Sequence, residues 1–327
     1  MSRQKLGQHF LSDISWRTRI AETLPVERDA IWLEIGAGHG EMTELLAARA
    51  RRVIAIETDA ALAAPLRERA AHSSAAANLP VETTLHSKST DSAATAGWPN
   101  VEIVHADVLS LDLAALVSSS ATNDLRQGTV STVPKDVGMS GALAPEARLK
   151  AGEPVNASAS NNRFRVYGNL PYYITSPILT HLFRFAALID SIHIVTQLEV
   201  AQRIAARPRS RDYGYLSTLC QFYARPELVC RIPPGAFQPP PKVTSALIEM
   251  HLPGERAALG IRDEPAFLKF LQTCFAHKRK TLRNNLRGTY PSDAVAKALA
   301  SAALTGNSRA EELTLRHFAQ LFLSLNA

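Results

Sequence analysis

The sequence predicts an α/β protein with a doubly wound, mostly parallel sheet, followed by a small all-helical C-terminal domain. Two observations predict this. Up to residue 252, short apolar runs rich in β-branched residues alternate with helical patterns, as in sheets whose parallel strands are joined by helices. After Pro253-Gly254 the apolar spacing is wholly helical. With 327 residues, 46% of them apolar, the chain can bury one large and one small core.

The parallel part of the sheet is predicted to hold five strands, at residues 31–35, 52–57, 101–107, 164–169 and 192–196. Two further strands, 228–232 and 243–250, flank a proline-rich turn and are expected to pair antiparallel at one edge. We therefore predict a first domain over 1–252 and a second over 253–327. In the second, Ser308-Arg-Ala-Glu311 has capping-box spacing ahead of an amphipathic helix over 315–325.

Two stretches, 72–100 and 117–163, interrupt these patterns. They are rich in Ala, Ser, Thr, Asn, Gly and Pro, and such composition buries little apolar surface. We predict disordered insertions without catalytic residues.

Positive charge gathers in the second domain. Residues 253–327 hold eleven Lys and Arg against six Asp and Glu, an excess of five out of the chain's net +6. If 278–287 is helical, one face forms a basic stripe for phosphates, although a solvated basic helix is the alternative. The predicted RNA-binding residues are Lys278, Arg279, Lys280, Arg283 and Arg287. A second basic patch comprises Arg203, Arg207, Arg209 and Arg211, where a solvated surface explains the charges nearly as well.

Cysteine usage and the N-terminus predict a cytoplasmic protein. The three cysteines have no C-x-x-C spacing and are expected to be reduced, structural thiols. The first residues lack an apolar segment typical of a secretion signal, and no apolar run is long enough for a membrane span.

A glycine loop follows the first predicted strand, in Glu34-Ile-Gly36-Ala-Gly38-His-Gly40-Glu41. Glycines there allow a ligand to approach the backbone. A dinucleotide-binding loop would have its third glycine at Glu41. A pyrophosphate would also meet Glu34, Glu41 and Glu44. The acidic loop therefore favours the cationic cofactor S-adenosylmethionine, with Gly36 and Gly38 as binding residues.

Two acids end the next two predicted strands. Glu57 could accept hydrogen bonds from both ribose hydroxyls of a nucleoside, and Asp107 could accept from the cofactor's adenine amino group. Each acid alone is equally well explained as a solvated residue. At successive strand ends on the ligand-binding edge of a sheet, they together indicate a nucleoside cofactor.

Asn169-Leu170-Pro171-Tyr172 ends the fourth predicted strand and suits methylation of an exocyclic amine. The amine of adenine is a poor nucleophile because its lone pair is delocalised into the ring. The Asn169 side-chain oxygen and the Leu170 carbonyl could accept its two N–H hydrogens. Pro171 would hold the chain extended, and Tyr172 offers a face on which the base can stack.

With these motifs in order, the chain resembles the ribosomal RNA adenine N6,N6-dimethyltransferases, the family of the kasugamycin-sensitivity methylase and the eukaryotic dimethyladenosine transferases. Three further segments carry the resemblance: 5–11 (Lys-Leu-Gly-Gln-His-Phe-Leu), 232–246 and 275–286. It implies a Rossmann-like methyltransferase fold, cofactor contacts from His9 and Leu11, and a role for Asn169 toward both cofactor and substrate. It also implies that Phe237 is a second aromatic that clamps the flipped adenine with Tyr172.

The implied reaction is dimethylation of two adjacent adenosines near the 3′ end of small-subunit (16S) ribosomal RNA, in immature 30S particles, as a step of ribosome biogenesis. Positioning supplies most of the acceleration, so no metal and no covalent intermediate are expected, and a monomer is the default. The chain departs from the family pattern at Tyr173, where many members carry Asn, and in its longer insertions.

Three alternatives stay open. The related large-subunit ribosomal RNA methylases of macrolide resistance share the glycine loop and a similar tetrad, but the basic segment 278–285 favours the small-subunit family. DNA adenine methylases usually carry an acid at the position of Asn169 and a second proline at that of Leu170. A ribosome-assembly or transcription factor without catalysis is disfavoured by the intact Gly36, Glu57, Asp107 and Asn169.

Overall fold

The structure is a computed structural model that describes residues 8–25, 27–76, 97–119 and 163–326. Contacts divide the chain into two compact units. Unit 1 comprises Met1–Leu24, Val166–Ala186 and Asp190–Ala327, and unit 2 comprises Pro25–Arg165 and Ala187–Ile189. The predicted boundary at residue 252 stays a prediction. Most of the two predicted insertions, at 77–96 and 120–162, lies outside the described residues.

Unit 2 holds three parallel strands in the order β4-β3-β2. These are β2 (Ile31–Ile35), β3 (Arg52–Glu57) and β4 (Val101–His105). All five residues of β2 and the last five of β3 are buried, as expected where helices cover both faces of a parallel sheet. The helical elements are α2 (Glu41–Ala47), α3 (Ala60–Ala76), η1 (Val108–Ser110) and α4 (Leu113–Ser118).

Unit 1 holds four strands in the order β5-β6-β9-β7, although β5 and β6 each begin in residues assigned to unit 2. They are β5 (Phe164–Asn169), β6 (Ile189–Gln197), β9 (Ser245–His251) and β7 (Arg225–Ile232). β9 runs antiparallel to both β6 and β7, and β7 lies at the edge. The predicted antiparallel edge pair is therefore confirmed.

A second, two-stranded sheet in unit 1 pairs β1 (Phe10–Leu11) antiparallel with β8 (Phe237–Gln238). The helices before residue 252 in this unit are α1 (Ile14–Thr23), α5 (Thr175–Phe183), α6 (Leu198–Ala205) and α7 (Tyr215–Tyr223). No helix among the described residues combines the length and the apolar character needed to cross a lipid bilayer.

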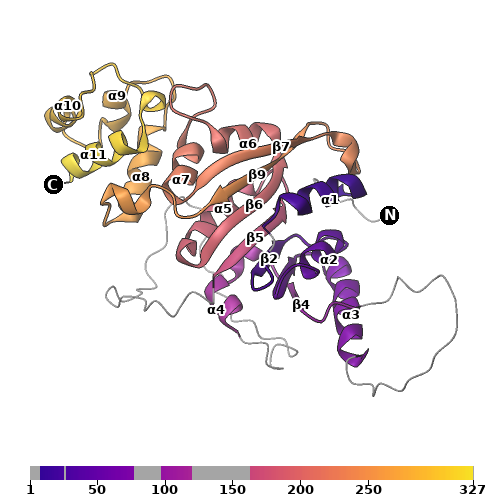
Figure 1. Ribbon diagram of the computed structural model, residues 1–327. Coiled ribbons are helices and arrows are strands. Elements are labelled where there is room, and N and C mark those ends of the chain that lie inside the picture. Colours follow the sequence, from indigo (N-terminus) through magenta and orange to yellow (C-terminus); the bar gives the residue numbers. More distant parts are fainter. Residues whose placement is uncertain (1–7, 26, 77–96, 120–162, 327) are drawn as a thin grey trace, which may run out of the picture. The chain divides into compact units, whose positions relative to one another are not determined.

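The described elements after β9 are all helical, as predicted. They are η6 (Arg256–Leu259), α8 (Glu264–Cys274), α9 (Leu282–Leu286), α10 (Ser292–Ser301), η7 (Ala310–Glu312) and α11 (Leu315–Leu325), grouped together in Figure 1. An aromatic core holds them to the rest of unit 1. The Phe267 ring lies 5.3 Å from those of Phe222 in α7 and Phe322 in α11.

The predicted basic helix over 278–287 is wrong. α8 ends at Cys274 and α9 begins only at Leu282. Asn285, buried in α9, donates from its side-chain amide to the carbonyls of Cys274 (2.7 Å) and His277 (3.2 Å), which fixes the intervening turns. The basic residues therefore do not form a stripe on one helix.

The predicted capping box at Ser308 is also wrong. The Ser308 hydroxyl instead accepts from the Thr305 N–H at 3.0 Å. Thr314 is the N-cap of α11, and its side chain accepts from the His317 N–H. The helix itself has the predicted bounds.

Candidate active site

The glycine loop of unit 2 runs from β2 into α2 in a conformation that requires glycine. Gly36, Gly38 and Gly40 all have positive φ, at 76°, 60° and 85°. The N–H groups of Gly36 and Ala37 donate to the Ile56 carbonyl of β3 at 2.8 and 3.2 Å. The loop is thus anchored to the neighbouring strand; Gly36 is exposed, whereas Gly38 and Gly40 are buried.

Gly40 is further restricted by its packing. A Cβ atom there would lie 2.6 Å from Leu66 Cδ2 and 2.7 Å from a ring carbon of Trp98. Trp98 is buried in a cluster with Ala37, Ala55 and Leu66, and the Arg69 guanidinium lies 4.2 Å from the centre of its ring. Trp98 falls in the stretch predicted as an insertion. Because it stands alone in a polar segment, the sequence did not predict that it packs beside the glycine loop.

Glu57 is held by the backbone of its own unit. It is only 4% exposed, and its two carboxylate oxygens accept from the N–H groups of Gly38 (2.9 Å) and Asp59 (2.8 Å). Each oxygen keeps a second lone pair for a ligand hydroxyl. The carboxylate at the end of β3 is therefore pre-oriented and tied to the glycine loop.

Glu34 does not supply the negative charge that its sequence position suggests. It is buried in β2, and the Thr43 hydroxyl of α2 donates to it at 2.6 Å. Burial raises its pKa to about 8, helped by the charges of Glu41 and Glu57 and opposed by the Thr43 bond. Glu44 is paired with Arg69 at 2.9 Å. The charge argument for a cationic cofactor therefore rests on Glu41 alone.

The buried Glu34 makes stability depend on pH. Because its pKa rises from 4.5 to about 8 on folding, the folded chain keeps a proton that the unfolded chain loses between these values. The free energy of unfolding should therefore fall as pH rises through this window, by a few kcal/mol in all. Glu34→Gln keeps an acceptor for Thr43 and should flatten this dependence, which urea unfolding at pH 5.5 to 8.5 would measure.

The exposed Glu227 of β7 offers a matched control. Glu227→Gln should unfold with the pH dependence of the native chain. If Glu34→Gln and the native chain lost stability in parallel between pH 5.5 and 8.5, Glu34 would be ionised in the folded protein.

Asp107 lies beyond β4, which ends two residues earlier than predicted. It is the N-cap of η1, and one of its oxygens accepts from the Leu109 N–H at 3.0 Å. This Asp-x-Leu capping bond explains the early end of the strand. The side chain is exposed, so its second oxygen can meet a ligand.

In unit 1, Asn169 ends β5, and the nitrogen and the oxygen of its side-chain amide have different surroundings. Its Nδ2 donates to the His9 carbonyl at 2.8 Å. This bond directs the nitrogen toward the N-terminal segment and leaves the side-chain oxygen available as an acceptor. Leu170 is buried, and its N–H donates to the Val195 carbonyl at 3.0 Å. The backbone at the tetrad is thereby fixed from β6.

Tyr172 is half-buried between two further groups of unit 1. Its hydroxyl lies 2.9 Å from the Ser245 hydroxyl of β9. Burial raises its pKa, against the effect of the Ser245 bond. Its ring stacks with that of His9, with centroids 5.8 Å apart and 24° between the planes. His9 is fixed in turn by a hydrogen bond from Nδ1 to the Pro239 carbonyl at 2.7 Å.

The other predicted aromatic, Phe237, is buried. It is 2% exposed and pairs across the small sheet with Leu11, which is also buried. The aromatic partner that the structure gives Tyr172 is therefore His9. Tyr173, by contrast, is 74% exposed.

The predicted site residues thus gather in two sets. Unit 1 contains His9, Leu11, Asn169, Leu170, Tyr172 and Phe237, whereas unit 2 contains Gly36, Gly38, Glu57 and Asp107. The polar partners Thr43 and Ser245 were not predicted, because only the fold brings them to Glu34 and Tyr172. Among the described residues, no group of three or more His, Cys, Asp or Glu side chains could hold a metal ion. The basic residues Lys278, Arg279, Lys280, Arg283 and Arg287 are all exposed.

Comparison with known proteins agrees with the motifs over the full length. The profile of a family described as "Ribosomal RNA adenine dimethylase" matches residues 1–81 and 82–327. The chain is 37% identical over 323 residues to "Ribosomal RNA small subunit methyltransferase A" of Koribacter versatilis (strain Ellin345), covering 99% of this chain and 94% of that protein.

Two solved structures share the fold. A dimethyladenosine transferase from Plasmodium falciparum superposes with a TM-score of 0.67 at 20% identity, over 97% of this chain and 98% of that one. The 23S rRNA methyltransferase ErmE superposes with a TM-score of 0.57 at 26% identity, over 97% of this chain and all of the other (100%). The predicted Rossmann-like methyltransferase fold is confirmed.

Proposed function

The chain belongs to the ribosomal RNA adenine dimethylase family, and we propose that it transfers methyl groups from S-adenosylmethionine to N6 of two adjacent adenosines near the 3′ end of small-subunit ribosomal RNA. The proposed substrate is the immature 30S particle in the cytoplasm. The observation that carries the proposal is the Asn169 amide, whose nitrogen is bound to His9 and whose oxygen is left to accept from an amine.

For the cofactor, we propose Gly36, Gly38, Glu57 and Asp107 of unit 2. The pre-oriented Glu57 carboxylate suits a pair of ribose hydroxyls, and the exposed Gly36 has no side chain to keep a ligand from the loop. Asp107 offers a free oxygen to the cofactor's adenine. His9, Leu11 and Asn169 of unit 1 complete the proposed cofactor residues. S-adenosylmethionine supplies an electrophilic methyl group on a positively charged sulfur.

For the amine, we propose that Asn169 Oδ1 and the Leu170 carbonyl accept its two N–H hydrogens. This draws the lone pair out of conjugation with the adenine ring. After the methyl group has moved to nitrogen, the cationic amine loses a proton to water without a strong base. The monomethyl product keeps one N–H, so it can still be held for a second transfer. No metal ion takes part.

For the base, we propose stacking on Tyr172. Its ring is already placed by the Ser245 hydroxyl and already accepts a flat partner, His9. For Phe237 to offer a second face, its buried ring must first become accessible.

For RNA, we propose that Lys278, Arg279, Lys280, Arg283 and Arg287 contact phosphates, acting from the turns around α9. Their exposure and the net charge of the helical part support this. The proposed domains are a catalytic part over 1–252 and an RNA-binding part over 253–327, acting as a monomer.

The large-subunit alternative is less well supported. Identity to the named small-subunit methyltransferase is 37%, compared with 26% to the 23S rRNA methyltransferase ErmE. A DNA adenine methylase fits less well because the tetrad has Asn169 and Leu170 where that class usually carries an acid and a second proline. A non-catalytic assembly factor fits less well because the proposed site residues are all present.

The test measures methyl transfer to 30S and to 50S particles from cells that lack the enzyme. Purified protein is incubated with each particle and with S-adenosylmethionine carrying a labelled methyl group. We expect label in 30S ribosomal RNA, as dimethyladenosine near the 3′ end, and none above background in 50S. Label confined to 50S would favour the alternative, and label in neither would refute the proposed activity.

A further inference from the structure

Tyr173 directly follows the proposed stacking residue Tyr172 in the chain. Its side chain is 74% exposed, the highest value among the exposed large apolar side chains that the structure describes. Within the described ranges, its hydroxyl has no hydrogen-bond partner and its ring stacks on no other ring. Single exposed aromatic residues are common on protein surfaces, so exposure alone assigns Tyr173 no role.

The backbone that carries Tyr173 is fixed on both sides. The Ile174 N–H donates to the Pro171 carbonyl at 3.2 Å and closes the turn that contains Tyr173. Thr175, the buried first residue of α5, has its hydroxyl 3.1 Å from that of Thr196 in β6. Tyr173 is therefore an exposed ring on a rigid support, and binding a partner has to order little beyond its two side-chain torsions.

The two consecutive tyrosines have different surroundings. Tyr172 is half-buried, is held by the Ser245 hydroxyl and stacks with His9, whereas Tyr173 is open to solvent. Their Cα atoms are ~3.8 Å apart, as for any two residues joined by a trans peptide bond. A ring inside the proposed site is thus followed at once by a ring outside it.

The proposed substrate has a matching arrangement. An adenine that leaves its stack to lie on Tyr172 uncovers the face of its neighbour in the strand. The two nucleotides are joined through one phosphate, so the neighbour stays close to the residue that follows Tyr172. Aromatic side chains hold unstacked bases of any identity, because every base has a flat π face.

We infer that Tyr173 stacks on the nucleobase next to the adenosine that is being methylated. Two consecutive tyrosines then hold two consecutive bases, one inside the site and one outside it. Because the two target adenosines are adjacent, this neighbour is, for one of them, the other adenosine. The Tyr173 ring touches no reacting atom, and its contact determines specificity by favouring a large base as the neighbour. The inference rests on the proposed function, because it starts from an adenine on Tyr172.

The test uses 30S particles reconstituted from unmethylated 16S ribosomal RNA. In separate particles, one or the other of the two adenosines is replaced by uridine, a small pyrimidine, or by guanosine, which keeps a purine face. The Kd of the full chain for each particle is measured, together with the single-turnover rate of methyl transfer to the remaining adenosine. For the native chain, we expect uridine at one of the two places to raise Kd about tenfold relative to guanosine at the same place.

Tyr173→Ala completes a double-mutant cycle with the uridine particle. It should raise Kd for the guanosine particle about tenfold, and uridine should then add less than about twofold, because the stacking contact is already lost. Tyr173→Phe keeps the ring and should retain the uridine effect. Calorimetric titration should show unchanged affinity for S-adenosylmethionine in both variants, and thermal unfolding checks the fold. The inference is overturned if the two effects multiply, or if Tyr173→Ala binds the guanosine particle as tightly as the native chain.

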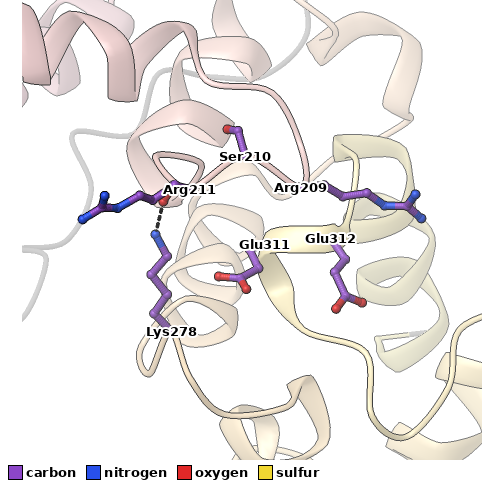
Figure 2. A pocket seen from close by; sticks show the side chains of 6 residues that line it. All are labelled: Arg209, Ser210, Arg211, Lys278, Glu311 and Glu312. Carbon is purple, nitrogen blue, oxygen red and sulfur yellow. Dashed lines mark hydrogen bonds between the residues drawn. The ribbon is translucent and has the colours of Figure 1, made fainter.

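Lys278 offers a matched control from a different surface. It is proposed to contact a phosphate, and such contacts carry no sequence information. Figure 2 shows it at a pocket of about 580 Å³ in unit 1, lined by Arg209, Ser210, Arg211, Lys278, Glu311 and Glu312. Lys278→Gln should weaken binding to every particle by one common factor and leave the uridine effect at its native size. Loss of the uridine effect in this variant as well would contradict a specific role of Tyr173.

The outcome is separable from that of the proposed function. If the cycle in Kd has the expected form while the native chain transfers no methyl group, the proposed activity fails and the stacking contact stands. If the native chain methylates both adenosines while Tyr173→Ala binds and methylates as the native chain does, only the assignment of Tyr173 fails.

Discussion

Asn169→Ala is expected to lower the rate of methyl transfer to immature 30S particles by a factor on the order of 10²–10³ or more, as when one preorganised hydrogen-bonding group is lost from an active site. The substitution removes the oxygen proposed to accept from the amine. It also removes the N–H that binds the His9 carbonyl at 2.8 Å. The measurement is single-turnover transfer of labelled methyl groups, with thermal unfolding as a check that the fold is kept.

Asn169→Asp separates the proposed acceptor role of the side-chain oxygen from the hydrogen bond of the side-chain nitrogen to His9. It keeps an acceptor oxygen but has no N–H for His9, so its rate should lie between those of the native chain and the alanine variant. Its affinity for S-adenosylmethionine should fall as well, because the N-terminal segment loses an anchor. Transfer by Asn169→Ala within about threefold of the native rate, a change in barrier below about 1 kcal/mol, would remove Asn169 from the proposed mechanism.

Gly40→Ala is expected to destabilise the chain by about 2–4 kcal/mol, through overpacking added to backbone strain. The new methyl group would lie 2.6 Å from Leu66 Cδ2 and 2.7 Å from Trp98, at a φ of 85°. Because the displaced atoms pack against the glycine loop, binding of S-adenosylmethionine should weaken too. Urea unfolding measures the first effect, and calorimetric titration with the cofactor measures the second.

Gly288 offers a matched control. Its φ is 89°, but a Cβ atom would meet nothing within 4 Å. Gly288→Ala should therefore show only the cost of the backbone conformation, about 1–2 kcal/mol. Combining Gly40→Ala with Trp98→Phe should cost less than the sum of the two single changes, since the shorter ring relieves the contact. Equal costs at Gly40 and Gly288 would mean that the Trp98 contact carries no penalty.

Much of the fold was predictable because several of its strands are short, mostly buried apolar runs. Ile31–Ile35, Arg52–Glu57 and Phe164–Asn169 have the predicted bounds, as does the amphipathic Leu315–Leu325. The break between α8 and α9 was not predictable from local pattern. It depends on hydrogen bonds from Asn285 to carbonyls 11 and 8 residues away. Tertiary contacts there override a helical spacing of arginines.

The assignment of the site residues stays a prediction, and their electrostatics were not predictable from the motifs. The motifs identify Gly36, Glu57 and Asn169, and the structure adds the bonds that orient the last two. Glu34 shows where the sequence argument was wrong. An acid beside a glycine loop is expected to be ionised, yet burial raises the pKa of Glu34 to about 8. Whether a carboxyl is ionised depends on its solvent exposure, which no local motif records.

The Asn169 amide links the proposed acceptor oxygen to the N-terminal segment. One hydrogen bond ties the chain's first described residues to a side chain 160 positions later. Because the amide is planar, displacing the N-terminal segment would remove one of the contacts that fix where the side-chain oxygen points. The N-terminal segment therefore helps to orient the acceptor, although none of its residues is proposed to touch the amine.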